Sequence, residues 1–113
     1  MTNFNKKQIN ALLPLWSYKT KKGYYDYIQR KVLFPSFSQA CSFMKEMFTE
    51  NEKMNHHCKY INDYTKVKIK MYTHSKNCVS AKDVAFANIV DRALNNYEHT
   101  VIKENNSDGM TDT

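Results

Sequence analysis

Paired cysteines and long apolar runs are both missing from this chain. Its three cysteines, Cys41, Cys58 and Cys78, lack the dense, paired spacing of a small secreted domain held together by disulfides. Residues 1–16 contain no long apolar run, so they resemble neither a signal peptide nor a membrane span. These absences favour a reducing compartment. They predict a cytoplasmic protein, with the nucleus as the alternative location, and no association with a membrane.

Arginine is also scarce. Lysines outnumber arginines by 15 to 2, in a chain of net charge +6 and pI near 9.2. Such a charge would suit a nucleic acid partner. Base recognition, however, prefers the rigid guanidinium fork of arginine to the ammonium group of lysine. We therefore interpret the lysines as a solvated surface and expect no nucleic acid partner.

The chain does have enough apolar material for one core. Of its 113 residues, 42% are hydrophobic and 13% are aromatic, as in globular domains and unlike disordered chains. This content predicts a single domain over residues 1–97. Residues 98–113 are polar and show no apolar periodicity, so they are expected to form a disordered tail. His99 lies in that tail and is expected to take no part in function.

The hydrophobic pattern switches between helical and extended periods along the chain. The expected elements are a helix over residues 5–13, strands over 16–19 and 24–34 joined by a turn with Gly23, a helix from Ser36, strands over 60–64 and 66–73, and a helix from Ser80. This order, α-β-β-α-β-β-α, predicts an α+β fold. We expect a four-stranded antiparallel sheet with three helices packed on one of its faces.

The helix that begins at Ser36 has more apolar residues than one buried stripe needs. The stripe that we expect to face the sheet is formed by Phe37, Ala40, Cys41, Met44 and Phe48. Phe43, Met47 and Met54 widen it and predict either a second contact surface, such as a subunit interface, or a more loosely packed core.

Three of the four histidines lie in one part of the chain, between Glu52 and Asp83. If residues 52–56 are helical, Glu52 and His56 are four residues apart and adjacent, so the carboxylate can orient the imidazole. His74 follows the last expected strand, where the sheet can direct it toward the loop after the second helix. The two segments are therefore expected to form one pocket.

The residues of this part of the chain are similar to those of a known family. They are Glu52-Lys53, His56-His57 two residues later, the aromatic residue Tyr60, Tyr64, Val67, Thr73-His74 and Asp83. This pattern resembles the signature of the pterin-4a-carbinolamine dehydratase family, and weaker similarities extend it to residues 12–94. The chain departs from the family at Cys58, where proline is usual, at Tyr60, where tryptophan is usual, and at Cys78, where glycine is usual.

The resemblance implies a lyase that dehydrates a 4a-hydroxytetrahydropterin to the quinonoid dihydropterin in tetrahydrobiopterin recycling. It implies no metal and no cofactor, a small-molecule pterin as substrate, and a homodimer or homotetramer. Imidazoles suit the reaction because they exchange protons near neutral pH.

By the same resemblance, the catalytic set is His56, His57, His74, Glu52 and Asp83. His56 and His74 would transfer protons, His57 would mainly bind substrate, and Glu52 and Asp83 would support the imidazoles. The substrate-binding set is Asn55, His56, His57, Tyr72, Thr73, His74, Ser75 and Trp16.

Three alternatives stay open at this point. Asp83 has the spacing of a capping-box partner of Ser80, a role that needs no catalysis. His56, Cys58, His74 and Cys78 offer the mixed nitrogen and sulfur ligands of a zinc site, although without the usual paired spacing. The domain could also be a non-enzymatic binding or dimerisation module, because some members of the family act as partners of a transcription factor.

Overall fold

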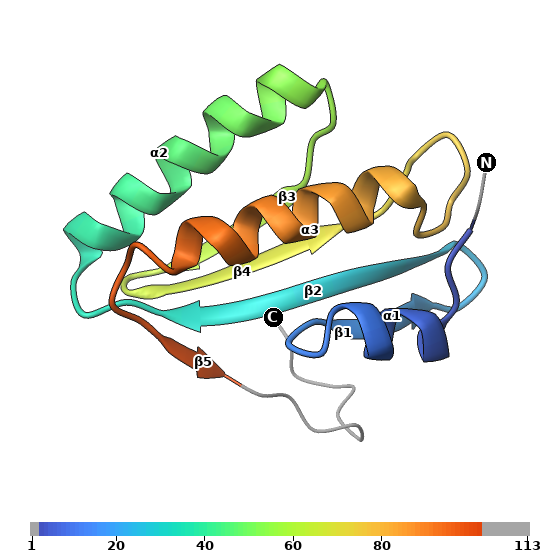
Figure 1. Ribbon diagram of the computed structural model, residues 1–113, viewed down its shortest axis with the longest axis horizontal. Helices are drawn as coiled ribbons and strands as arrows, with labels where there is room; N and C mark the ends of the chain where they lie inside the picture. Colours follow the sequence, from blue (N-terminus) through green and yellow to red (C-terminus); the bar gives the residue numbers. More distant parts are fainter. Residues whose placement is uncertain (1–2, 103–113) are drawn as a thin grey trace.

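The computed structural model describes residues 3–102, which form three helices and five strands (Figure 1). In chain order these are α1 (Lys6–Leu12), β1 (Ser17–Lys21), β2 (Tyr25–Leu33), α2 (Phe37–Met54), β3 (Lys59–Asp63), β4 (Lys66–Met71), α3 (Ala81–Leu94) and β5 (Thr100–Ile102). The strand order is β1-β2-β4-β3, every pair is antiparallel, and β5 pairs with β2. The expected α+β class, element order and antiparallel sheet are confirmed.

The expected number of strands is wrong by one. Thr100, Val101 and Ile102 pair with Leu33, Val32 and Lys31 of β2, although the polar composition had assigned them to a disordered tail. Three consecutive β-branched residues favour an extended backbone, and Val101 and Ile102 are half-buried against the sheet. The rest of the expected tail, residues 103–113, lies outside the described residues.

Polar residues at the helix starts explain where the helices begin. Asn5 caps α1 and forms a capping box with Gln8. The hydroxyl of Ser36 accepts a hydrogen bond from the backbone N–H of Gln39 at the start of α2. Ser80 and Asp83 form the expected capping box of α3. Each cap satisfies backbone N–H groups that lack a partner inside the helix, so the helix boundaries follow local sequence.

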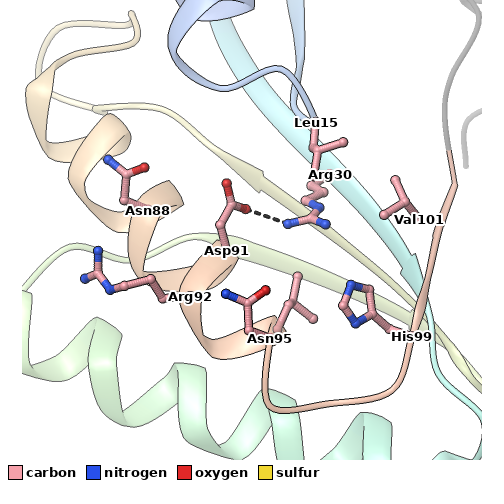
Figure 2. Close-up of a pocket in the computed structure, with 9 residues that line it drawn as sticks. Leu15, Arg30, Asn88, Asp91, Arg92, Asn95, His99 and Val101 are labelled. Carbon is pink, nitrogen blue, oxygen red and sulfur yellow. Dashed lines mark hydrogen bonds and ion pairs between the residues drawn. The ribbon is translucent and has the colours of Figure 1, made fainter.

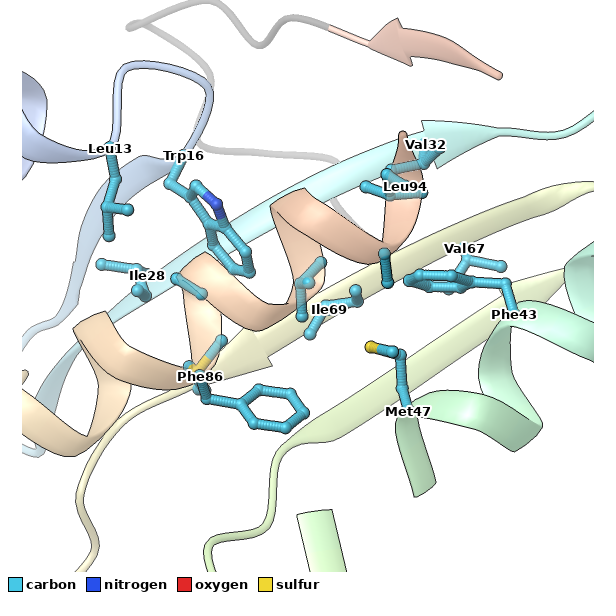
Figure 3. Packing of buried hydrophobic residues seen from close by; sticks show 14 of the residues in the cluster. Leu13, Trp16, Ile28, Val32, Phe43, Met47, Val67, Ile69, Phe86 and Leu94 are labelled. Atoms are coloured by element: carbon cyan, nitrogen blue, oxygen red, sulfur yellow. The ribbon is translucent and has the colours of Figure 1, made fainter. Parts of the chain in front are cut away.

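The helices lie on one face of the sheet and enclose the core (Figures 1 and 3). Ile28, Val32, Val67 and Ile69 project from β2 and β4 and are fully buried. They pack in one cluster with Phe43 and Met47 of α2, Phe86, Val90 and Leu94 of α3, and Ile9, Leu13 and Trp16 near the N-terminus. None of the helices in residues 3–102 is both long and apolar enough to cross a membrane.

The core-facing side of α2 differs from the expected one. Phe43 and Met47 are 0% exposed, so they belong to the core and are not candidates for a subunit interface. Phe37 and Phe48, which were expected to face the sheet, are 46% and 49% exposed. The error arose because α2 is apolar on two sides and the buried side includes a polar residue, Asn51, which obscured its periodicity.

A cavity of about 290 Å³ lies between α3, β2 and β5 (Figure 2). Arg30 of β2 is 3% exposed there and donates a hydrogen bond to Asp91 of α3, which also accepts one from the indole nitrogen of Trp16 at 2.9 Å. Because one carboxylate pairs the buried arginine and the buried tryptophan, these groups stabilise the contact between β2, α3 and the start of β1.

Candidate active site

A second cavity, of about 140 Å³, brings together the loop after α2 and the turn after β4. It is lined by Tyr25, Tyr27, His57, Cys58, Lys59, Lys70, Met71, Tyr72 and His74. Lys59 and Lys70 are paired across β3 and β4, and this register places His57 and His74 beyond neighbouring ends of the two strands. The two segments singled out from the sequence therefore meet at one cavity.

Asn55 determines where the two adjacent histidines point. It caps the C-terminus of α2 in the left-handed conformation, with φ of 51°, so the helical path ends before His56. As a result, Glu52 contacts Nε2 of His57, at 3.0 Å, and not His56 as helical spacing had suggested. Both side chains of this pair are exposed, at 59% for His57 and 79% for Glu52, so solvent weakens their interaction.

His56 is held by a different carboxylate. Its Nε2 lies 2.7 Å from Oδ1 of Asp83, and both side chains are buried. The other oxygen of Asp83 accepts hydrogen bonds from the hydroxyl of Thr73, at 2.7 Å, and from the backbone N–H of Ser80, at 2.9 Å. Asp83 is therefore both the capping-box partner of Ser80 in the first turn of α3 and the partner of His56. A single buried carboxylate thus links the loop after α2, the turn after β4 and α3.

Asn51 of α2 holds the loop after α2 through hydrogen bonds of its side chain. Its side-chain amide donates to the carbonyl of His56 at 2.9 Å and to Sγ of Cys58 at 3.2 Å, while the hydroxyl of Tyr60 donates to its oxygen at 2.6 Å. Burial raises the pKa of the Cys58 thiol and of the Tyr60 hydroxyl, and burial followed by the charge of Asp83 raises the pKa of Cys78. These groups therefore stay protonated at neutral pH. The contacts of Cys58 and Tyr60 with Asn51 hold the loop after α2 in place.

Aromatic rings form one wall of the cavity. The rings of Tyr25 and Tyr72 are stacked with centroids 4.0 Å apart and planes inclined by 6°. The imidazole of His74 also stacks on Tyr72, with the two ring centroids 4.3 Å apart. The arrangement offers a flat ligand aromatic faces beside two imidazoles.

Several residues of the expected substrate-binding set lie elsewhere. Trp16 is 3% exposed, belongs to the core and bonds Asp91, so it does not line this cavity. Thr73 is buried beside Asp83, and Asn55 and Ser75 are exposed and are not among the lining residues, although Ser75 follows His74 directly. His56 is also not a lining residue, although His57 beside it is.

The residues proposed as zinc ligands do not assemble. Within residues 3–102, no three histidine, cysteine, aspartate or glutamate side chains lie close enough to hold a metal ion. Cys58 instead contacts Asn51 and Tyr60, and His56 contacts Asp83. The three cysteines form no disulfide.

Asn51, Tyr25 and Tyr27 were not anticipated as residues of the site. Asn51 could have been found, because it is the polar member of an otherwise apolar series with Ala40, Phe43 and Met47 at helical spacing. The two tyrosines reach the cavity only through the pairing of β2 with β4. Sequence spacing does not give that pairing.

Comparison with known proteins relates the sequence of this chain to one family. Residues 2–93 match the model of the family described as pterin 4 alpha carbinolamine dehydratase. A protein of Burkholderia lata, named "Putative pterin-4-alpha-carbinolamine dehydratase", is 35% identical over 93 residues, which cover 82% of this chain and 88% of that protein. A protein of the same name from Prochlorococcus marinus is 30% identical and is covered over 93% of its length.

Two solved structures have a similar fold. A "transcriptional coactivator/pterin dehydratase" from Brucella melitensis superposes with a TM-score of 0.69 at 27% identity, over 81% of this chain and 98% of that one. A pterin dehydratase-like protein described as a RuBisCO assembly factor of the alpha-carboxysome superposes with a TM-score of 0.59 over 69% of this chain. Its 20% identity supports a common fold alone.

Proposed function

Because this chain belongs to the pterin-4a-carbinolamine dehydratase family, we propose that it dehydrates a 4a-hydroxytetrahydropterin to the quinonoid dihydropterin. The observation that carries the proposal is the cavity lined by His57 and His74, together with the buried pair His56–Asp83, whose histidine adjoins His57 in the chain. In a cell, this reaction would recycle a tetrahydrobiopterin-like cofactor after its use by a hydroxylase. The three free cysteines fit a cytoplasmic setting.

The reaction is an elimination that requires two proton transfers. The bond between C4a and the hydroxyl oxygen breaks as that oxygen receives a proton, and N5 loses its proton as the C4a–N5 double bond forms. Water and the quinonoid dihydropterin are the products, and no electrons are gained or lost overall. A positioned acid and a positioned base are therefore sufficient catalysts, and imidazole can serve as either near neutral pH.

We assign the proton transfers to His74 and His56. His74 lines the cavity, and its ring is fixed by stacking on Tyr72. The carboxylate of Asp83 orients His56 and occupies its Nε2, so Nδ1 is the nitrogen that would exchange a proton with the substrate. Within residues 3–102, the exposed pair His57–Glu52 is held by a single contact, between Nε2 and a carboxylate oxygen, which suits a binding role for His57 at the cavity wall.

A homo-oligomer is a further part of the proposal. Phe37, Phe48 and Tyr64 are 46%, 49% and 72% exposed, and the rings of Phe37 and Tyr64 contact each other with centroids 6.3 Å apart. Large aromatic groups gathered on the outer side of α2 and on the adjacent β3–β4 turn are typical of an interface. The same surface favours the second candidate function, a non-enzymatic binding module, as does the coactivator named in the Brucella melitensis structure.

Turnover separates the two functions. The 4a-hydroxytetrahydropterin can be generated in place by an aromatic amino acid hydroxylase, and its decay followed by ultraviolet absorbance with and without this protein. We expect catalytic amounts of the protein to accelerate the decay well above the uncatalysed rate, which has to be subtracted. A decay rate that is unchanged by equimolar, folded protein would contradict the enzyme and favour the binding module.

A further inference from the structure

Arg30 of β2 is an almost fully buried arginine whose hydrogen bonding is incomplete. It is 3% exposed, and its Nη1 donates to Oδ1 of Asp91. Its Nε is also buried and has no hydrogen-bond partner within residues 3–102. A guanidinium carries five N–H donors, and a buried donor without an acceptor destabilises the fold. A ligand that accepts hydrogen bonds beside Arg30 would satisfy more of these donors.

Arg30 lines the cavity of about 290 Å³ between α3, β2 and β5. In Figure 2 the side chains of Asp91, Asn95, His99 and Val101 lie around the end of Arg30. The volume is close to the lower end of the roughly 300–1,000 Å³ that is usual for ligand pockets. Within residues 3–102, this cavity shares no lining residue with the candidate active site. A small ligand can therefore occupy it independently of a substrate.

The charges that line this cavity do not cancel. Arg30 and Arg92 are the two arginines of a chain with 15 lysines, and both line this one cavity. Among the described residues of the lining, Asp91 is the single carboxylate, and its Oδ1 already accepts hydrogen bonds from Arg30 and from Trp16. The lining therefore carries one positive charge in excess, which favours a ligand with negative charge.

The rest of the lining contains amide groups and apolar side chains. Asn88 and Asn95 of α3 carry side-chain amides, whose NH₂ groups can donate hydrogen bonds to an anion. Leu15, Leu94 and Val101 supply the apolar part of the lining. The planar fork of arginine matches the two oxygens of a carboxylate or a phosphate. The lining as a whole suits an organic anion with a hydrocarbon part.

From these observations we propose that the cavity between α3, β2 and β5 is a second binding site, for a small organic carboxylate or phosphate monoester. The charged group of the ligand is bound by Arg30 and attracted by Arg92, and its hydrocarbon part packs on Leu15 and Val101. Lysine at these two positions would supply the charge without the planar fork, so the site accounts for arginine in a chain that otherwise uses lysine. The site does not depend on the dehydratase function.

Titrations followed by two-dimensional ¹H–¹⁵N NMR test the site, with benzoate and phenyl phosphate as anionic probes and benzyl alcohol as the neutral one. We expect the anions to shift the amide signals of residues 88–95 and 99–101 and the Nε–H signal of Arg30. Benzyl alcohol should bind at least roughly 10-fold more weakly, because it lacks a charged acceptor. The tighter-binding anion identifies the carboxylate or the phosphate as the preferred group.

A matched pair of substitutions locates the charged group of the ligand. Asn95→Asp adds a carboxylate to the lining and should weaken benzoate binding by roughly 1.5- to 5-fold. Asn96→Asp makes the same change one residue later, at an exposed position outside the lining, and should have a smaller effect. Arg30→Gln should weaken binding by roughly 10- to 150-fold, the contribution of a hydrogen bond to a charged group. Because Arg30 also pairs with Asp91, the asparagine pair keeps the test decisive if Arg30→Gln does not fold.

Three results would overturn the proposal. The first is that neither anion shifts the signals of residues 88–95 and 99–101, or that the shifts are confined to the surroundings of His57 and His74, at the other cavity. The second is that benzyl alcohol binds as tightly as the anions. The third is that Asn95→Asp and Asn96→Asp change the affinity for benzoate equally.

Discussion

Replacement of Asp83 by asparagine tests the buried link between the fold and the site. The carboxylate is 0% exposed and accepts hydrogen bonds from His56, Thr73 and Ser80. Asparagine has the same shape but only one accepting atom. If its oxygen keeps Thr73 and Ser80, its NH₂ group faces Nε2 of His56, and two donors meet unless the imidazole moves its proton to Nδ1. The substitution should therefore change the tautomer of His56.

The expected loss of stability follows from the number of bonds. A hydrogen bond to a charged group contributes about 1.5–3 kcal/mol. Asp83→Asn weakens two of these three bonds, those from Thr73 and Ser80, and disrupts the third, with His56, so we expect a loss of about 2–3 kcal/mol in the free energy of unfolding. Asp83→Ala leaves three buried donors without an acceptor and should cost about 3–5 kcal/mol. Asp63→Asn, at an exposed position of β3, is the control and should remain within about 0.5 kcal/mol of the parent.

Urea unfolding at equilibrium measures the loss, and the ¹⁵N chemical shifts of the His56 ring report its tautomer. If Asp83→Asn lowers stability by less than about 1 kcal/mol and leaves the His56 shifts unchanged, the proposed role of Asp83 in orienting this ring is incorrect. A tautomer change with intact turnover would show that His56 is oriented by Asp83 but transfers no proton.

Three further predictions concern stability and assembly. Burial raises the pKa of Cys58 above its ordinary 9.0, so the folded chain holds this proton more tightly than the unfolded chain does. The stability that this difference in pKa contributes is fully present below pH 9 and is lost as the pH rises above 9. The free energy of unfolding, measured in urea, should fall from about pH 9 upward, and less steeply in Cys58→Ala. A chain that ends at Ile102 keeps β5 and should retain the full turnover rate. A chain that ends at Tyr97 loses the apolar area that β5 buries, so its free energy of unfolding in the same urea assay should be about 1–3 kcal/mol lower. Phe48→Glu should shift the protein toward smaller species in light scattering, and a parent protein that is monomeric at micromolar concentration would contradict the proposed oligomer.

Local features of the sequence were sufficient to predict most of the fold. The capping pairs Asn5–Gln8 and Ser80–Asp83 act over three residues, and the hairpin around Gly23 depends on neighbouring strands and one turn with positive φ, 86° at the glycine. Such short-range interactions are specified by short-range patterns. The strand β5 was missed because its three residues are too few to produce a periodic signal, and their pairing with β2 is long-range.

The candidate site could be predicted only in outline. Spacing identified the segments that carry His56, His57 and His74, but not which carboxylate holds which ring. That outcome depends on the left-handed conformation of Asn55, which ends α2 and turns His57 back to Glu52. Asparagine is one of the few residues that adopts this conformation readily, yet nothing at the level of sequence required it here.

The residues that form the aromatic wall of the cavity could not be predicted from the sequence either, because they meet through long-range strand pairing. Tyr25 is 47 residues before Tyr72 in the chain, and the two rings meet because β2 and β4 pair with Ile28 opposite Met71. Trp16 shows the opposite error. A match to the family pattern suggested substrate binding, whereas its burial and its bond to Asp91 give it a structural role. A match of one aromatic residue to a family pattern does not by itself distinguish packing from binding.

The most direct test of the account is the turnover of a generated 4a-hydroxytetrahydropterin by folded histidine variants. We predict that His56→Ala and His74→Ala each lower kcat by roughly 10²- to 10⁴-fold, the usual contribution of a positioned acid or base. The double variant should be little slower than the slower single variant, because the two groups serve one step, and His57→Ala should mainly raise KM. Circular dichroism and urea unfolding confirm that each variant is folded. If folded His56→Ala and His74→Ala both turn over the hydroxypterin at the parent rate, histidine catalysis at this cavity is contradicted.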